Sequence, residues 1–481
     1  MSSSASSTNF APSQLEAGLE KKAASRIVDW DGPEDRENPQ NWSPRKRWGH
    51  VVIISMDIGV DYVCFSTPDY FLVDRSDHMS YFCPLVSYSL NMAPTMCAPG
   101  AKDIAADLHI TSTVVSTLTV TIYVLGIAIV PMFMSPLSEM YGRVPVYHTA
   151  MAIFVTFIIG NALSKTTAQF MIFRFISGCA GGTLMALGGG TIADLTSVQQ
   201  RAVAMALFSM GPLAGPVLGP VIGGFVAAGK SWRWTFWLLA ILGGFFGFTA
   251  VLVLRETNPN TLSPRQVLLQ VLVCPVMLLV RSPILFVISL YVALVFGVTY
   301  LLFTTFISVF EGQYGFSTSI SGLTYLGLGV ALVISMVLFN LLNGHVKAAR
   351  MKADGVQQPR PDPFVAGGLF LYGWTAYYKI HWSVPILGTS LMGFGAFFVI
   401  TPSQLYLIDV FGSEAAASAL GANNLLRYIS STFLPLAGPA MYSSLNYGWG
   451  NSLLGFIALA FVPAPVLFYK YGEQLRTHAS A

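Results

Sequence analysis

The sequence predicts an all-α polytopic membrane protein built from two six-helix halves. Three observations support this: the composition, a series of apolar runs long enough to cross a bilayer, and one run rich in glycine and proline. The 481 residues are 54% hydrophobic and only 10% charged, with a mean hydropathy of +0.61. Soluble domains carry about 25% charged residues. Most of the surface must therefore face something other than water.

The charge and cysteine content exclude several function classes. A net charge of +3 gives no reason to expect nucleic acid as a partner. The five cysteines lack metal-ligand spacing, so we expect neither a metal site nor a disulfide framework. No Ser/His/Asp cluster or paired carboxylates stand out, and we expect neither an enzyme nor a cofactor. Residues 1–47 are polar and predict a disordered cytosolic N-terminal tail.

Successive apolar runs predict the membrane helices, since a span needs about 20 mostly apolar residues. The expected spans two to seven are Thr113–Met134, Val146–Leu163, Ala168–Ala193, Ala202–Ala228, Trp234–Leu254 and Ile284–Phe310. The expected spans eight to twelve are Ile320–Leu342, Phe364–Tyr378, Val384–Ile408, Ala415–Tyr442 and Leu453–Tyr469.

Span one does not fit this pattern. Val51–Met56 starts an apolar run and Cys83–Cys97 could finish it, but residues 57–80 hold five aspartates. Each ionised group near the bilayer centre costs roughly 2.5–3.5 kcal/mol on insertion scales. We hypothesise that 57–80 is an insertion, such as a translated intron. The alternative is a genuine extramembrane loop between two half-helices.

Loop charges predict the orientation. The loops that hold Arg143, Arg201 and Arg255 carry far more Lys and Arg than the other set, which places them in the cytosol together with both termini. The expected domains are a 48–254 bundle, a 255–283 cytosolic linker, a 284–471 bundle and a 472–481 cytosolic tail. We expect a monomer in the cell membrane, with the vacuolar membrane as the alternative location.

A short segment, Ser135–Pro145, joins spans two and three and predicts a cytosolic gate. Glu139 can face a helix N-terminus, Gly142 supplies a turn, and Arg143 can pair with Asp194 at the cytosolic end of span four. Such pairs must break when the two halves move. The alternative is an ordinary solvated turn.

Arg174 lies about two turns, roughly 10 Å, inside span four. An intramembrane arginine is costly and marks a functional position. The alternative is that its side chain extends to the nearer interface. The same two interpretations apply to Arg427 in span eleven.

Span five carries the glycine- and proline-rich run. Three prolines would break such a helix in water, whereas in a bilayer neighbouring helices can satisfy the carbonyls that are freed. Glycines every fourth residue form a smooth stripe for close helix approach. The residues of this glycine- and proline-rich helix are Gly211, Pro212, Gly215, Pro216, Gly219, Pro220, Gly223 and Gly224.

Together these motifs resemble the major facilitator superfamily, and specifically the fungal twelve-span drug:proton antiporters. The resemblance implies the major facilitator fold, with two six-helix bundles around a cavity lined by spans one, four, seven and ten. It also implies proton-driven export, with Arg174 tied to coupling. The residues then expected at the cavity are Asn91, Arg174, Tyr300, Phe303, Gln404, Asn423 and Asn424. No cavity carboxylate stands out, so the proton carrier stays unassigned.

Several alternatives remain open at this stage. The leading hypothesis is an exporter of amphipathic small molecules, such as drugs, toxins or secondary metabolites. A proton-coupled importer or polyamine carrier could use the same fold, and a non-transporting membrane protein or defective gene product is the alternative of another class. Residues 224–231 match a phosphate-loop pattern, but that loop needs a preceding strand in a soluble domain, so we expect no nucleotide.

Overall fold

The computed structural model describes residues 42, 91–195, 215–253, 275–350 and 363–463. Within these ranges every regular element is a helix, as the sequence predicts. The predicted tails, most of the linker, the 57–80 stretch and the start of span one lie outside the described residues.

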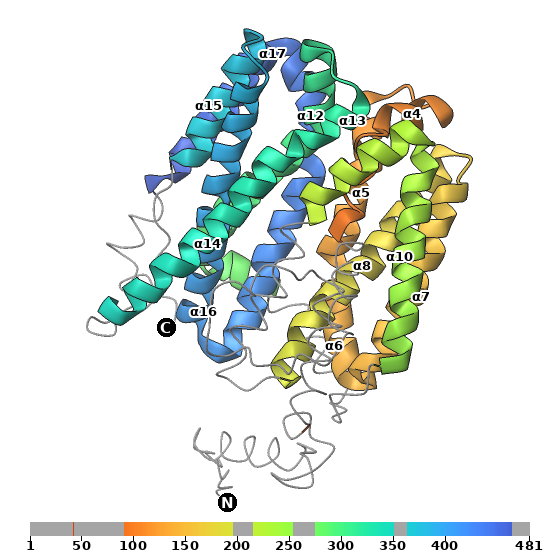
Figure 1. Ribbon diagram of the computed structural model, residues 1–481. Coiled ribbons are helices and arrows are strands. Elements are labelled where there is room, and N and C mark those ends of the chain that lie inside the picture. The colour runs from red at the N-terminus through yellow and green to blue at the C-terminus, as the bar shows by residue number, and fades with distance from the viewer. Residues whose placement is uncertain (1–41, 43–90, 196–214, 254–274, 351–362, 464–481) are drawn as a thin grey trace, which may run out of the picture.

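In the described part of the N-terminal half, the helices expected for spans two, three, four and six follow one another in the predicted order (Figure 1). A turn at residues 93–100 leads into the short helix α4, and the Gly215–Gly229 helix is the described part of span five. The helices are α4 (Ala101–Asp107), α5 (Thr113–Ile129), α6 (Pro131–Tyr141), α7 (Arg143–Leu163), α8 (Thr167–Leu195) and α10 (Trp232–Val253).

The C-terminal half follows the same plan. Its elements are α12 (Pro283–Tyr314), α13 (Thr318–Leu323), α14 (Tyr325–Arg350), α15 (Phe364–Tyr377), α16 (Ser383–Phe433), η4 (Leu434–Ala437) and α17 (Gly438–Phe461). With its 51 residues, α16 is too long for one crossing of a hydrocarbon core about 30 Å thick. Near the start of α16, Gly388 contacts Tyr372 of α15. Near its end, Ser430 contacts Gly297 of α12. The helix therefore turns back at its lower end in Figure 1 and supplies both span ten and most of span eleven.

Two predicted boundaries are wrong. Span twelve was expected to start at Leu453, but the chain turns at Asn446 (φ 57°, ψ 176°) and is helical again directly afterwards. The Ser135–Pro145 segment was expected to be a loop, but α6 continues to Tyr141 and α7 starts at Arg143. A single glycine therefore makes this turn.

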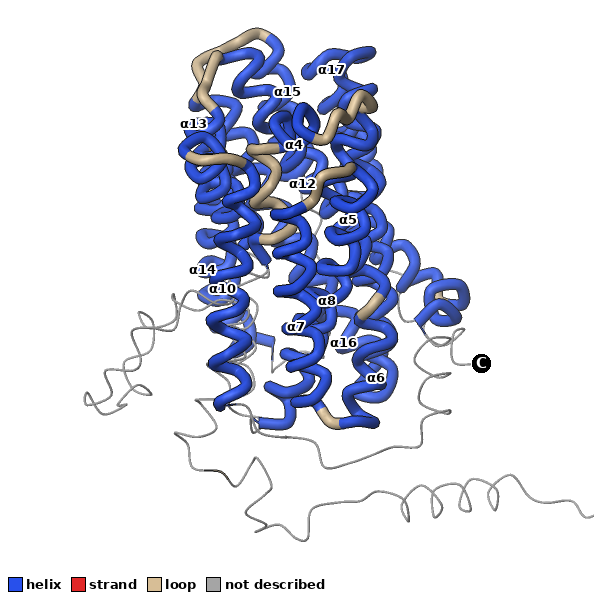
Figure 2. Tube along the Cα trace, turned by 90° about the vertical axis from the view of Figure 1, so that its right-hand side faces the viewer, coloured by secondary structure: helices blue, strands red, loops and turns tan. Residues whose placement is uncertain are grey.

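Seven of the described helices are long and apolar enough to cross a membrane. One of them is Thr113–Met134, the range predicted for span two. Figure 2 shows these helices running side by side, with the short connections gathered at their ends. The end that carries α4 and α13, at the top of Figure 1, is called the α4 end below.

An ion pair fastens α4 to the rest of the N-terminal half. Arg233, in the first turn of α10, donates to the Asp107 carboxylate, and the Trp232 indole donates to the same carboxylate over 3.1 Å. The Arg233 hydrogen bond holds the pKa of Asp107 below its ordinary value. Because an acid with a lowered pKa stabilises the fold above that pKa and stops doing so only as the pH falls through it, this contact persists in mildly acidic solution.

Candidate functional site

Arg174 is fully buried at the centre of the N-terminal half. Its guanidinium donates to the carbonyls of Ala93 (2.8 Å) and Pro94 (3.1 Å) in the turn that follows span one. It also donates to the carbonyls of Thr119 (Nε, 3.2 Å) and Val120 (3.2 Å) of α5. The side chain does not extend to the interface, so that alternative is wrong. Arg174 instead ties spans one, two and four together.

The local sequence explains why these carbonyls are within reach. Pro94 has no N–H, and the backbone hydrogen bonds of the 93–100 turn end on Met92, Thr95 and Cys97. None of these backbone bonds uses the Ala93 or Pro94 oxygen, so both oxygens can accept from Arg174, and the Cys97 thiol also donates to the Pro94 oxygen over 3.9 Å. On the other side, α5 and α8 approach closely, since a Cβ on Gly126 would lie 2.5 Å from the Cys179 nitrogen.

Aromatic rings and a thiol complete the Arg174 environment. The guanidinium carbon lies 5.0 Å from the centre of the Tyr123 ring and 5.6 Å from that of Phe236, in the range of a cation–π contact. The Cys97 sulfur accepts from Arg174 over 3.1 Å. Among the described residues, no carboxylate pairs with Arg174. Its charge is thus solvated by carbonyl dipoles and rings.

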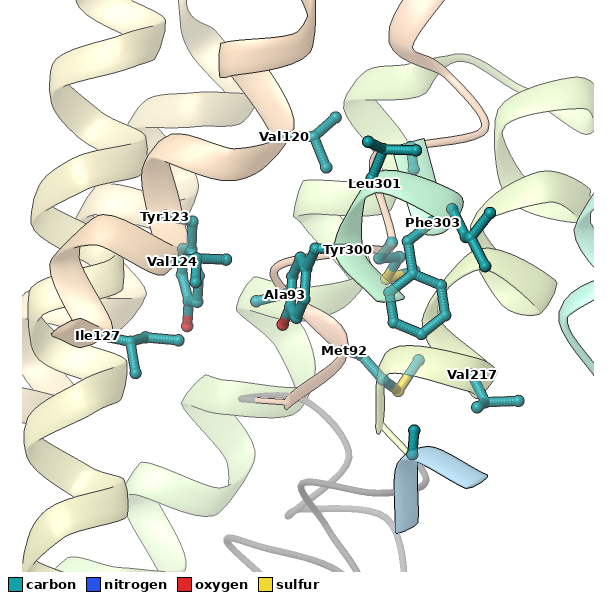
Figure 3. Packing of buried hydrophobic residues seen from close by; sticks show 14 of the residues in the cluster. Met92, Ala93, Val120, Tyr123, Val124, Ile127, Val217, Tyr300, Leu301 and Phe303 are labelled. Carbon is teal, nitrogen blue, oxygen red and sulfur yellow. The ribbon is translucent and has the colours of Figure 1, made fainter. Parts of the chain in front are cut away.

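Tyr300 and Phe303, both predicted cavity residues, lie buried on α12 where it faces the N-terminal half. Figure 3 shows them in one cluster with Tyr123 of α5 and with Met92 and Ala93 of span one. The Tyr300 and Phe303 rings are 5.6 Å apart and nearly perpendicular. The two halves therefore meet through aromatic surface at this level.

The remaining predicted cavity residues differ in how far they are buried. Asn423 of α16 is fully buried, while Gln404 and Asn424 are half-buried. Among the described residues, neither amide atom of Asn423 has a hydrogen-bond partner, and the Asn424 carbonyl oxygen also lacks one. Asn91 is buried against span five, where its Cβ meets Gly215.

The glycine stripe of span five makes the predicted close helix contact, and its partner is span one. A Cβ on Gly215 would overlap Asn91, and a Cβ on Gly223 would overlap the Met96 carbonyl. A Cβ on Gly219 would lie 2.7 Å from the Thr95 hydroxyl. Pro220 lacks the N–H that would bond the carbonyl of Pro216 four residues earlier. The Thr95 hydroxyl donates to that carbonyl instead, over 3.2 Å. A neighbouring helix thus satisfies the oxygen that proline frees.

The opposite face of the same helix packs on the C-terminal half. A Cβ on Gly329 of α14 would overlap Val217, and one on Gly322 of α13 would lie 2.7 Å from the Pro220 carbonyl. Gly224, one residue beyond the stripe, faces Thr318. The Gly215–Gly229 helix is therefore held closely on both sides.

A charged contact also joins the halves at the α4 end. Lys102 of α4 forms an ion pair with Glu311 of α12, which also accepts from the Thr318 hydroxyl over 2.9 Å. The Lys102 side chain is 63% exposed and that of Glu311 16%. Lys102, Glu311 and Thr318 are called the clamp below.

We expect the clamp to favour the state in which the α4 end is closed. Glu311→Lys should reduce transport through like-charge repulsion, and only several-fold, because a partly exposed pair contributes about 1 kcal/mol or less. The double variant Lys102→Glu with Glu311→Lys reverses the pair and should restore transport. Initial transport rates of the singles and the double give the coupling. A double variant as slow as the worse single would contradict a pairwise role.

Gly142 forms the turn between α6 and α7. Its φ of 89° and ψ of 155° lie in a region that is essentially restricted to glycine. Arg143, next along the chain, is 7% exposed and so does not lie in a solvated turn. The side chains of Glu139 and Asp194 are outside the described residues, as are Gly211 and Pro212, so the predicted Arg143–Asp194 pair stays a prediction.

We expect Gly142→Ala to destabilise the protein by about 1–3 kcal/mol, because alanine disfavours this backbone conformation. Thermal unfolding of the purified protein measures the effect. Gly244→Ala is the matched control, since nothing lies within 4 Å of a Cβ there and the backbone is helical. Equal midpoints for the two variants would contradict the assignment of strain to Gly142.

Sequence reasoning missed two parts of the site. The Ala93–Pro94 carbonyls carry no side-chain signal, although the proline itself marks a break in span one. The clamp joins residues 209 positions apart, and nothing in the local pattern of either segment indicates the other.

Comparisons with known proteins agree with this geometry. Residues 85–435 match the model of the Major Facilitator Superfamily. The chain is 46% identical to MFS transporter prlG of Fungal sp. (strain NRRL 50135), over 93% of this chain and 96% of that protein. It is 38% identical to efflux pump radE of Floropilus chiversii, over 96% and 87%. It is 40% identical to the trichosetin biosynthesis cluster MFS transporter of Gibberella fujikuroi, over 94% and 89%.

Among solved structures, the fold is similar to that of a D-xylose–proton symporter, with a TM-score of 0.65 and 16% identity over 86% of this chain and 98% of that one. The fold, the apolar helices and the family match agree on a multi-pass membrane transporter and not an enzyme. The chain belongs to the Major Facilitator Superfamily.

Proposed function

We propose that this protein is a proton-coupled antiporter that exports amphipathic small molecules of the secondary-metabolite class by alternating access. Two relatives support the direction and the class of cargo, because one is named an efflux pump and another belongs to a biosynthesis cluster. The aromatic surface around Tyr300 and Phe303 suits apolar cargo.

The observation that carries proton coupling is the burial of Arg174 without a carboxylate partner among the described residues. A permanent charge held by carbonyls of span two and of the turn after span one is sensitive to any proton that arrives nearby, because Coulomb interactions are strong where water is excluded. Protonation of a neighbouring group would change how firmly Arg174 holds span one against α5. Binding of a proton would thereby be coupled to the relative positions of span one and α5.

Alternating access is supported by the distribution of contacts between the halves. The clamp and the contacts of the Gly215–Gly229 helix with α13 lie toward the α4 end. With the arginine-rich loops in the cytosol, as the sequence predicts, this arrangement corresponds to a state closed toward the outside. Export then requires the clamp to open.

A polyamine carrier fits less well. Polyamines are cations, and a site for them requires acidic side chains. The buried charged residues of the described chain are instead Arg143, Arg174 and Arg427. Buried positive charge repels a polycation.

The experiment is efflux of labelled amphipathic compounds from cells that lack their own pumps, with and without a proton uncoupler. We expect the protein to lower cellular accumulation, and the uncoupler to abolish this effect. Accumulation that the protein does not change for any compound, or an effect insensitive to the uncoupler, would contradict the proposal.

A further inference from the structure

We propose that Arg427 and Asn423 of α16 form a binding site for an anionic group, so that the cargo is an amphipathic organic acid. The inference rests on the proposed export function and adds the charge of the cargo. It names a specific anchoring pair in the C-terminal half, distinct from Arg174.

Arg427 has donor capacity left over. The residue is only 9% exposed. Its guanidinium donates to the Tyr428 hydroxyl over 2.9 Å, while its Nε has no partner in the described part of the chain. Arg174 contrasts with it, because the Arg174 Nε and both terminal nitrogens all have acceptors. A guanidinium offers five N–H groups in a planar fork that matches a carboxylate. Arg427 is therefore the buried arginine with donors free for a ligand.

Asn423 supplies the second, independent observation. It lies one turn before Arg427, on the same face of the helix. Its side chain is fully buried, and neither amide atom has a hydrogen-bond partner within the described ranges. A buried polar group left unpaired destabilises the protein. A ligand oxygen that accepts from both side chains would satisfy the Arg427 Nε and the Asn423 amide N–H together.

The surroundings favour a negative and partly aromatic ligand. The Arg427 guanidinium stacks 4.7 Å from the centre of the Phe296 ring, and Phe296 in turn lies 5.3 Å from Tyr300. Among the described residues no Asp or Glu is buried. The buried charge in the described part of the chain is thus positive, and aromatic rings lie next to it.

The chemistry points to a carboxylate or another delocalised oxyanion joined to an apolar body. The anion would pair with the guanidinium and the apolar part would lie on the rings of α12. An uncharged analogue would keep the apolar contact and lose the charge-assisted hydrogen bonds, which are the stronger part of such a site.

The test measures binding to the purified full-length protein at neutral pH. The probes are three matched acid and amide pairs: dansylglycine, 4-phenylbutyrate and indole-3-acetate, each with its primary amide. We expect at least one acid to bind about tenfold more tightly than its amide, since a hydrogen bond to a charged group accounts for roughly this ratio or more. Arg427→Gln should remove that preference and leave amide binding unchanged.

Further variants separate a local charge effect from a structural one. Arg427→Lys should restore part of the preference, and Asn423→Ala should reduce it without abolishing it. Arg281→Gln is the control, because Arg281 is exposed and lies two residues before α12 begins. Equal affinity for acid and amide in all three pairs, or a preference that survives Arg427→Gln, would overturn the inference. Uncoupler-sensitive efflux of neutral compounds alone would keep the exporter and reject only its acid selectivity.

Discussion

Replacing Arg174 with Ala is expected to abolish uncoupler-sensitive efflux while the protein still reaches the membrane. The substitution removes the hydrogen-bond donors to the carbonyls of Ala93, Pro94 and Val120 together. Hydrogen bonds to charged groups contribute about 1.5–3 kcal/mol each, so the link between spans one, two and four is lost. Efflux rate per molecule in the membrane is the measurement.

Arg174→Lys and Arg281→Gln make this prediction specific. Lysine keeps the charge but presents three donors from one point and cannot reproduce the planar fork, so we expect efflux to fall at least tenfold. The exposed Arg281 should be replaceable without effect. Wild-type transport by Arg174→Ala would remove this arginine from the mechanism.

Replacing Gly215 with Leu is expected to have the second largest effect. A side chain there would overlap Asn91, including its backbone carbonyl carbon 2.6 Å from the new Cβ. Overpacking against backbone costs about 1–3 kcal/mol or more, and the helix would have to move away from span one. We expect efflux to fall at least tenfold and the thermal midpoint to drop.

Gly244→Leu is the matched control, because it lies in α10 with nothing within 4 Å of its Cβ. Transport by that variant should match wild type. If Gly215→Leu also transported normally at normal abundance, the close contact between spans one and five would have no part in the transport cycle.

The sequence predicted what local pattern determines. Apolar length located span two as Thr113–Met134 and put spans seven and ten within a few residues of their observed starts, since hydrophobic thickness fixes helix length. Glycine spacing predicted a close helix contact, which the structure assigns to span one. The identity of that partner could not be predicted, because nothing in residues 215–229 refers to residues 91–96.

Sequence reasoning fell short where partners are distant or are backbone atoms. The cost of a buried charge predicted a role for Arg174, but its acceptors depend on how α5, α8 and the 93–100 turn pack together. The Lys102–Glu311 pair depends on how the two halves meet. The predicted gate, with Glu139 at a helix N-terminus and Arg143 paired with Asp194, stays a prediction because the Glu139 and Asp194 side chains lie outside the described residues.

The most direct test of the account is cargo flux in proteoliposomes that contain the purified protein and an imposed pH difference. The account predicts that cargo moves against its own gradient when protons flow the opposite way, that reversing the pH difference reverses the flux, and that Arg174→Ala removes both effects. Flux that follows only the cargo gradient and is the same at every pH difference would contradict proton-coupled antiport.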